Sequence, residues 1–272
     1  MTMWFFISSI VLSFFTLIPL SIKWELDRRL TIPTALFIGV ISGSIVYGIS
    51  TLWIIPFYMI IIIEFLLIGV ISIFMLLWRF FRDPERLPPK DKNCILSPAD
   101  GQIKYIKKIE KGEIPFSEKK GRTFFLYDFV QADVLPQGGH LIGIAMNYLD
   151  VHVNRAPISG RVSLLKHIRG SFLSLKKKEA VVQNERNLIV IENKHLKLGI
   201  VQIASRLVRK IVPYIKEGQE IQKGTRIGII RFGSQVDLIL SDLPSICIKV
   251  NPGEKVKAGL SIIATLDELN KT

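Results

Sequence analysis

The chain has 272 residues, of which 49% are hydrophobic, and it carries a formal net charge of +13. Its two cysteines, Cys94 and Cys247, are too few and too far apart in sequence to form a disulfide framework or a thiolate metal site. The four histidines show neither H-x-H nor H-E-x-x-H spacing. The sequence therefore predicts no metal centre.

The N-terminal part of the chain is long, apolar and almost free of charge. Residues 3–22 contain no charged side chain, and residues 34–78 contain only Glu64. Because about 20 apolar residues cross a bilayer, the first stretch predicts one span and the second predicts two. No Lys or Arg precedes Lys23 and no small-residue cleavage site is evident, which argues against a signal peptide. We expect residues 1–78 to form a membrane anchor of three transmembrane helices.

Basic residues predict the orientation of this anchor. They follow the first span and the third span, and none lies near residues 50–56; they are Lys23, Arg28, Arg29, Arg79, Arg82 and Arg86. Three spans place both basic segments on one side, which the positive-inside rule makes cytoplasmic. We expect a protein of the cell (inner) membrane with its soluble domain on the cytoplasmic side. Glu64 is expected near the outer interface or hydrogen-bonded within the hairpin of the second and third spans.

The net charge belongs to the second part of the chain. Acidic and basic residues balance up to residue 78, so the whole excess lies in residues 79–272. An excess of basic residues often indicates nucleic-acid binding, but a domain tethered to a bilayer lies closer to anionic lipid headgroups. We therefore expect an anionic membrane as the partner, and no nucleic acid.

Residues 79–272 have the pattern of a mainly β domain. Short β-branched runs alternate with Gly, Pro and Asn, which is typical of an all-β sandwich or barrel. The runs cover residues 141–149, 187–192, 196–204, 225–232, 236–241, 245–250 and 260–266.

Two short motifs each occur twice in this domain. SPADGQI (97–103) and APISGRV (156–162) share P-x-x-G-x-[IV], while GQEIQKG (218–224) and GEKVKAG (253–259) share G-x-x-[IV]-x-x-G. These turns with apolar flanks resemble the paired turns of biotinyl or lipoyl-type β-sandwiches. We expect a duplicated barrel-sandwich hybrid.

Three residues are candidates for chemistry: Asp100 in a turn, His152 at the end of a strand, and Ser234 in FGSQVD. Each has an ordinary alternative, because Asp before Gly is a common turn, a histidine can be a satisfied half-buried group, and Gly-Ser is a common loop dipeptide. Together they could form a Ser-His-Asp hydrolase. However, the nucleophile elbow G-x-S-x-G is absent, since Phe232 and Val236 occupy its glycine positions.

The strings around these residues resemble the phosphatidylserine decarboxylase family in its short, membrane-anchored form. The resemblance spans about residues 79–265 and rests on FFRDPER (80–86), SPADG (97–101), DVHVNRAPISGRV (150–162), NERN (184–187), QIAS (202–205) and RFGSQVD (231–237). The chain departs from the family at Gln235, where GSQ replaces GSR, and at Ser205, where QIAS replaces QIAG. The first 33 residues carry no motif of the family.

The resemblance implies that the chain cuts itself between Gly233 and Ser234. In the proenzyme, His152 would remove the proton from Ser234 while Asp100 holds the imidazole, and the hydroxyl oxygen would attack the carbonyl of Gly233. Elimination and hydrolysis would leave a pyruvoyl group, derived from Ser234, on a small chain that stays with the large one. This pyruvoyl cofactor would form a Schiff base with phosphatidylserine and release CO2 to give phosphatidylethanolamine.

Other assignments stay open at this point. Arg155 could bind the lipid phosphate or could form a structural pair with a carboxylate. The chain could decarboxylate a related aminophospholipid, could be an inactive, uncleaved relative, or could be a carrier module of the biotinyl type, although no Met-Lys-Met-like lysine is present. A homo-oligomer is compatible with the sequence.

Overall fold

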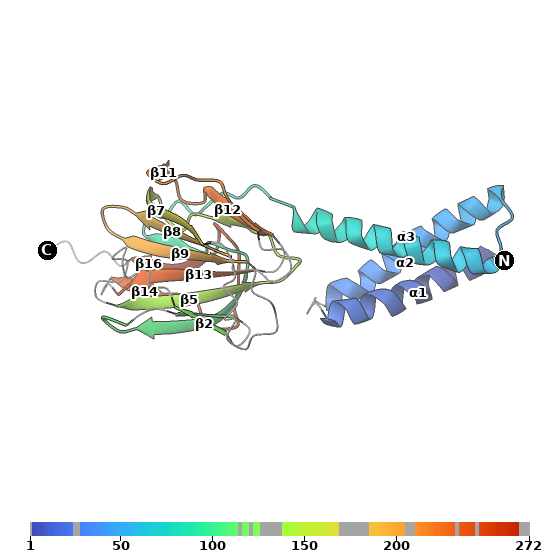
Figure 1. The fold of residues 1–272 in the computed structure, drawn as a ribbon, viewed down its shortest axis with the longest axis horizontal. Coiled ribbons are helices and arrows are strands. Elements are labelled where there is room, and N and C mark those ends of the chain that lie inside the picture. The colour runs from blue at the N-terminus through green and yellow to red at the C-terminus, as the bar shows by residue number, and fades with distance from the viewer. Residues whose placement is uncertain are drawn as a thin grey trace. The chain divides into compact units, whose positions relative to one another are not determined.

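The computed structural model describes residues 2–23, 28–113, 116–119, 122–125, 138–168, 185–204, 210–231, 234–242 and 245–266. Within it the chain forms two compact units. One comprises Met1–Arg82 with Asn147–Leu149, and the other comprises Asp83–Met146 with Asp150–Thr272. Helices make up the first unit and strands the second, as the ribbon in Figure 1 shows.

The first unit contains three helices, α1 (Thr2–Lys23), α2 (Arg28–Leu52) and α3 (Phe57–Phe80). Each is long and apolar enough to cross a membrane, so the predicted number of helices is confirmed. Glycines bring α2 close to α1: a Cβ on Gly39 would lie 2.7 Å from the Cα of Ile10, and one on Gly43 would lie 3.0 Å from the carbonyl oxygen of Phe5. Small residues four apart allow this close helix packing.

Glu64 links the third helix to the first. Its side chain is fully buried, and its Oε1 accepts a hydrogen bond of 2.8 Å from the hydroxyl of Ser8 on α1. The bond therefore joins α3 to α1, whereas we expected either a position near the outer interface or a bond within the hairpin. A carboxylate among apolar helices requires such a donor, because its desolvation is otherwise costly. The first helix thus supplies a polar partner to the third.

The second unit is mainly β. All seven runs expected to be strands are confirmed. The strands are β1 (Cys94–Leu96), β2 (Gly101–Ile109), β3 (Phe116–Lys119), β4 (Arg122–Phe125), β5 (Gly139–Met146), β6 (Val153–Arg155), β7 (Gly160–Ile168), β8 (Arg186–Glu192), β9 (Lys197–Ile203), β10 (Lys210–Pro213), β11 (Glu220–Ile221), β12 (Arg226–Arg231), β13 (Ser234–Ser241), β14 (Ile246–Ile248), β15 (Lys255–Val256) and β16 (Ile262–Leu266).

A curled eight-stranded sheet with the order β11-β7-β8-β9-β13-β5-β2-β15 dominates this unit. Two three-stranded sheets, β1-β16-β14 and β10-β12-β6, and the hairpin β3-β4 complete it, as Figure 1 shows in part. Side chains alternate across β13, since Val236 and Leu238 enter the main core while Ile239 enters a smaller cluster on the opposite face. Both faces of this central strand are therefore buried.

The repeated motifs pair with one another in the same register. Gly101 lies opposite Val256 at the β2–β15 edge, and Gly160 lies opposite Ile221 at the β7–β11 edge. The backbone bonds outside these ladders are duplicated too: Ile103 N to Glu254 O (2.9 Å) and Gly253 N to Ile103 O (2.8 Å) correspond to Val162 N to Gln219 O (2.9 Å) and Gly218 N to Val162 O (2.8 Å). The sequence repeat is thus a structural repeat.

Glycine is required where the first repeat motif meets the sheet. Gly101 has φ +149°, and a Cβ there would lie 2.3 Å from the carbonyl oxygen of Ala145. We expect Gly101→Ala to lower the free energy of unfolding by more than about 1 kcal/mol, because both the backbone angle and the contact oppose a side chain. Thermal unfolding in detergent measures the loss. Gly112→Ala is the control, since Gly112 has φ +82° but open space around it; an equal loss in both variants would contradict the steric explanation.

Candidate functional site

His152 lies immediately before β6 and is fully buried. Its Nδ1 is 2.9 Å from the carbonyl oxygen of Asp150. A carbonyl oxygen can only accept a hydrogen bond, so Nδ1 carries the proton in this contact and Nε2 is the basic nitrogen of the neutral ring. The backbone carbonyl of His152 accepts a bond from the N–H of Ile230 at 3.2 Å, which anchors this segment to β12. The loop itself therefore sets the tautomer and orientation of the imidazole.

Asp100 is buried at the turn before β2, where three hydrogen bonds hold its carboxylate. Arg86 donates from Nη1 to Oδ1 at 2.5 Å and from Nη2 to Oδ2 at 2.9 Å, and the backbone N–H of Ala258 donates to Oδ1 at 2.8 Å. Arg86 also donates to the carbonyl of Ala258 at 2.8 Å. Within the described residues these bonds come from Arg86 and Ala258, and His152 is not among the donors. One acceptor position on Oδ2 stays available.

Comparison of the two structural repeats separates turn capping by Asp100 from a role of Asp100 in the chemistry. Ser159 occupies the equivalent turn position, and its hydroxyl oxygen accepts the backbone N–H of Lys223 at 2.9 Å, as Asp100 accepts that of Ala258. A neutral hydroxyl therefore suffices to cap this turn. Burying a charge is costly even when it is paired, so turn capping does not explain a carboxylate with an arginine at position 100. This difference marks Asp100 as a functional candidate.

The segment Asp83–Arg86, at the start of the second unit (the β unit), contacts the rest of that unit at two places. Besides the pair between Arg86 and Asp100, Asp83 contacts the Nε of Arg226 at 2.5 Å and the Nη2 of Arg155 at 3.2 Å. Glu85 accepts from the Nη2 of Arg226 at 2.7 Å. The segment thus supplies Arg86 to Asp100. Its carboxylates, Asp83 and Glu85, bind Arg155 and Arg226.

Of the two alternatives considered for Arg155, the structural pair is formed. Arg155 is 3% exposed, and it donates to Asp83, to the carbonyl of Pro84 at 3.0 Å and to the carbonyl of Gly224 at 3.1 Å. These bonds occupy both terminal nitrogens of its guanidinium. Lipid binding by Arg155 stays a prediction, and it would require these contacts to be exchanged.

The contact between Glu85 and Arg226 predicts a dependence of stability on pH. The hydrogen bond and charge of Arg226 lower the pKa of Glu85 from its ordinary value of 4.5. Since the folded state favours the carboxylate, this contribution is present above pH 4.5 and is lost as the pH falls through the lowered pKa. We expect Glu85→Gln to lower the melting temperature slightly at pH 7 and less at pH 3. A difference that does not change with pH, or that added salt does not reduce, would contradict this contact.

Ser234 is the first residue of β13 and pairs with Met146 on β5. Gly233 lies outside the described residues, as does the side chain of Ser234. The structure therefore places the backbone of Ser234 at the head of a central strand. It leaves the contact between its hydroxyl and His152, which we expected, as a prediction.

Gln235 belongs to a buried polar cluster on β13. Its Nε2 donates to the carboxylate of Asp237 at 2.8 Å and to the hydroxyl of Tyr105 at 3.0 Å, and this hydroxyl donates to Asp237 at 2.7 Å. Gly143 makes room for the Tyr105 ring, because a Cβ there would lie 2.4 Å from the ring. The residue at which this chain departs from its expected family thus has a defined place, next to the bond expected to break.

A chain of buried amides links the strands around His152. The Nδ2 of Asn187 on β8 donates to Gln202 on β9, and the Nε2 of Gln202 donates to Asn154 on β6, each at 2.8 Å. The Nδ2 of Asn154 faces the sulfur of Met146 at 4.0 Å, and Met146 is opposite Ser234. All three amides are fully buried. They fix the strand after His152 relative to the strand beside Ser234.

Sequence reasoning missed several of these residues. Arg86, Asn154, Asn187, Gln202 and Asp237 all lie inside strings that carried the resemblance, yet they received no role. Polar residues in otherwise apolar strands, such as Gln202 in LGIVQIA, were the available signal, because a buried polar group needs a partner.

Comparisons with known proteins identify the family of this chain. The family model for phosphatidylserine decarboxylase matches residues 73–264. Proteins of Methanocaldococcus jannaschii and Methanothermobacter thermautotrophicus, both provisionally named archaetidylserine decarboxylase proenzyme, are similar to this chain. The first is 43% identical over 201 residues, which is 74% of this chain and 95% of its own length. The second is 39% identical over 193 residues, which is 71% and 82%.

A bacterial relative is also similar. The phosphatidylserine decarboxylase proenzyme of Erythrobacter litoralis is 38% identical over 208 residues, which is 76% of each chain. The family model covers more than half of this chain, including Asp100, His152 and Ser234. The chain therefore belongs to the phosphatidylserine decarboxylase family.

Proposed function

We propose that this protein is a self-cleaving decarboxylase that converts phosphatidylserine to phosphatidylethanolamine. The match of the family model over residues 73–264 carries this conclusion. The word proenzyme in the names of the relatives supports self-cleavage. This chemistry is compatible with the burial of His152 and Asp100 and with the place of the Ser234 backbone at the head of β13.

In the proposed cleavage, the Nε2 of His152 accepts the proton of the Ser234 hydroxyl, whose oxygen then attacks the carbonyl carbon of Gly233. The amide nitrogen of Ser234 takes up a proton as its bond to that carbon breaks, which leaves an ester. Loss of the Ser234 α-proton expels Gly233 as a carboxylate, and water then replaces the nitrogen, which leaves as ammonia. The glycine at position 233 leaves the attacked carbonyl accessible.

Asp100 is proposed as the acid that stabilises the protonated imidazole of His152 through its charge. The open acceptor position on its Oδ2 supports this role, while the bidentate bond from Arg86 fixes the plane of the carboxylate. We assign Arg86 as a positioning residue that acts through Asp100. The carbonyl of Asp150 holds the Nδ1 of His152 while Nε2 serves as the base, so this carbonyl orients the ring and Asp100 acts through its charge.

The position of Ser234 fits a pyruvoyl group at the new N-terminus. β13 pairs with β5 over eight positions and with β9 over six, so the strand that carries the group stays fixed after cleavage. The pyruvoyl ketone supplies an electron sink for the pair released as CO2 departs. His152 is the proposed donor of the proton that replaces the carboxylate, since cleavage and decarboxylation use its base and acid forms at different stages.

The small chain is expected to stay bound to the large one after cleavage. Residues 234–272 contribute β13 to the centre of the large sheet and β16 to a second sheet, and Val236, Leu238 and Leu240 are fully buried. Size-exclusion chromatography in mild detergent should recover both fragments in one peak, and denaturant should separate them. Release of the small chain without denaturant would contradict this arrangement.

Archaetidylserine is the second candidate substrate, because two of the similar relatives carry its name. Both names end in serine, so the headgroup chemistry is shared and the apolar part distinguishes the two lipids. The test is CO2 release by the purified full-length protein from vesicles that contain either lipid. The proposal is supported if the wild type turns over phosphatidylserine and Ser234→Ala does not. If only archaetidylserine is turned over, it is the substrate in place of phosphatidylserine.

We propose that α1, α2 and α3 cross the cell (inner) membrane and that the β unit lies on the cytoplasmic side, as the basic residues predict. A reporter fused to the C-terminus should be active in the cytosol, and activity only outside it would reverse this orientation. The duplicated register of the repeat motifs supports the biotinyl-like barrel-sandwich class for the β unit.

A further inference from the structure

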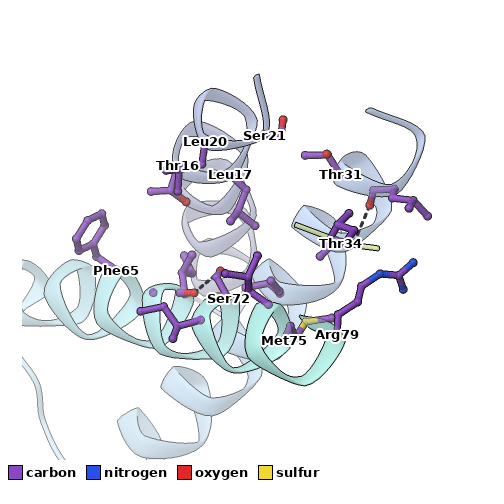
Figure 2. Close-up of a pocket in the computed structure, with 17 residues that line it drawn as sticks. Thr16, Leu17, Leu20, Ser21, Thr31, Thr34, Phe65, Ser72, Met75 and Arg79 are labelled. Atoms are coloured by element: carbon purple, nitrogen blue, oxygen red, sulfur yellow. Dashed lines mark hydrogen bonds between the residues drawn. The ribbon is translucent and has the colours of Figure 1, made fainter. Parts of the chain in front are cut away.

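The three helices enclose a pocket that the proposed reaction does not use. Its volume is about 540 Å³, and residues of all three helices line it. In Figure 2, Leu17 and Leu20 come from α1, Thr34 comes from α2, and Met75 and Arg79 come from α3. This volume falls within the range of known ligand sites, which are concave and mostly apolar.

The lining is mostly apolar. Three of its hydroxyl groups are bound within their own helices, since Thr16 donates to Leu12 O at 2.9 Å, Thr34 to Leu30 O at 2.7 Å and Ser72 to Ile68 O at 2.5 Å. These walls therefore suit an apolar ligand such as a hydrocarbon chain, which packs against them by van der Waals contact.

Arg79 is the charged residue of the lining, and it lies in the last turn of α3. Its side chain is exposed, and no carboxylate among the described residues forms an ion pair with it. In the part of the chain that the structure describes, the pocket thus combines apolar walls with one available cation. An amphiphile with a hydrocarbon chain and an acidic headgroup complements both.

We propose that this pocket binds an anionic glycerophospholipid of the surrounding bilayer, with an acyl chain between the helices and the phosphate at Arg79. Lipid is the solvent of a membrane-spanning helix bundle, so the ligand is present at high local concentration. The guanidinium selects an acidic headgroup, because it pairs with phosphate in a bidentate geometry and is attracted to anionic lipid. The site is distinct in its residues from Asp100, His152 and Ser234.

Two glycines allow a matched test. A Cβ on Gly69, which lines the pocket, would meet nothing within 4 Å, and the same holds for Gly48 on α2, which does not line it. Gly69→Leu therefore fills the pocket without an initial clash, and Gly48→Leu adds the same side chain elsewhere. Both substitutions favour helix formation, so neither is expected to prevent folding.

The experiment uses the full chain in vesicles of phosphatidylcholine that contain a photoactivatable diazirine analogue of phosphatidylglycerol, which is anionic but is not the proposed substrate, or of phosphatidylcholine. Peptide mapping should find the acidic probe on the α1 and α3 segments around the pocket. Gly69→Leu should reduce this labelling at least fivefold, and Gly48→Leu should not change it. Arg79→Gln should reduce the preference for the acidic probe about fivefold, since one basic residue near the surface contributes about that factor.

Labelling that Gly69→Leu does not reduce would overturn the site, and equal labelling of wild type by both probes would overturn its preference for acidic lipid. The inference shares membrane insertion with the proposed function but does not depend on decarboxylation. Ser234→Ala should therefore abolish cleavage and leave the labelling unchanged. Labelling lost in Ser234→Ala would also count against an independent site in the helices.

Discussion

Ser234→Ala is expected to leave a single full-length chain and to abolish decarboxylation. Alanine has no hydroxyl oxygen to attack the carbonyl of Gly233, so neither the break in the backbone nor the pyruvoyl group can form. The effect should be a complete loss of both, because the same side chain is nucleophile in the first process and precursor of the cofactor in the second. Denaturing electrophoresis and CO2 release from phosphatidylserine vesicles measure the two losses.

Ser241→Ala provides the matched control on the same strand. The hydroxyl of Ser241, the last residue of β13, donates to the carbonyl of Lys197 at 3.2 Å and has no proposed part in the chemistry. This variant should be cleaved and active at the wild-type level. Cleavage or decarboxylation that survives in Ser234→Ala would refute the role assigned to Ser234.

Asp100→Asn is expected to slow self-cleavage by about two orders of magnitude or more. The amide keeps an oxygen that can accept the backbone N–H of Ala258, but it removes the charge that stabilises a protonated His152 and that binds Arg86. The fold of the turn should persist while the chemistry is lost. The appearance of the small fragment over time, measured after synthesis of the chain in vitro, gives the rate.

Ser159, the equivalent residue of the other repeat, provides a control that separates slower cleavage from a loss of turn stability. Ser159→Ala removes the cap on Lys223 N, so it should cost about 1 kcal/mol of stability without changing the cleavage rate. Arg86→Gln should slow cleavage, and Arg86→Lys should restore part of the rate, because lysine keeps the charge but not the two parallel bonds. If Asp100→Asn and Ser159→Ala reduce stability alike and neither slows cleavage, Asp100 is only a turn residue.

Much of the fold could be predicted because it depends on local patterns. The three helices follow from charge-free runs of sufficient length, and the strands follow from β-branched runs between turn residues. The repeat was also visible in sequence, since Gly101 and Gly160 are required by the same close approach to a neighbouring carbonyl. The helices and strands are decided by residues near one another in the chain, and the repeat motifs are short enough to be read directly from the sequence.

The partners of the polar residues could not be predicted, because tertiary pairing decides them. Asp83 binds Arg155 and Arg226, which lie opposite each other on β6 and β12, and nothing near Asp83 in the sequence indicates either arginine. Glu64 likewise finds Ser8 on a helix that the family model does not cover. Arg86 matters most for the chemistry, since its two bonds to Asp100 occupy an acceptor position on each oxygen of the carboxylate proposed to assist His152.

Gln235 illustrates what the structure adds to a difference in sequence. The departure from the arginine expected in the family suggested an altered site next to the cleaved bond. The structure shows its amide bound to Asp237 and Tyr105, where it joins the polar cluster on β13. The neutral residue is therefore accommodated within this cluster, and the neighbouring residues Gly233 and Ser234 are unchanged in sequence.

Self-cleavage between Gly233 and Ser234 is best tested by intact-mass analysis. The protein is purified from native expression and its chains are separated under denaturing conditions. We predict two chains, the smaller comprising residues 234–272 with a blocked N-terminus and a mass lower than that of the serine-initiated fragment by one ammonia. A single full-length chain, or a small chain that begins with an unmodified serine, would contradict it.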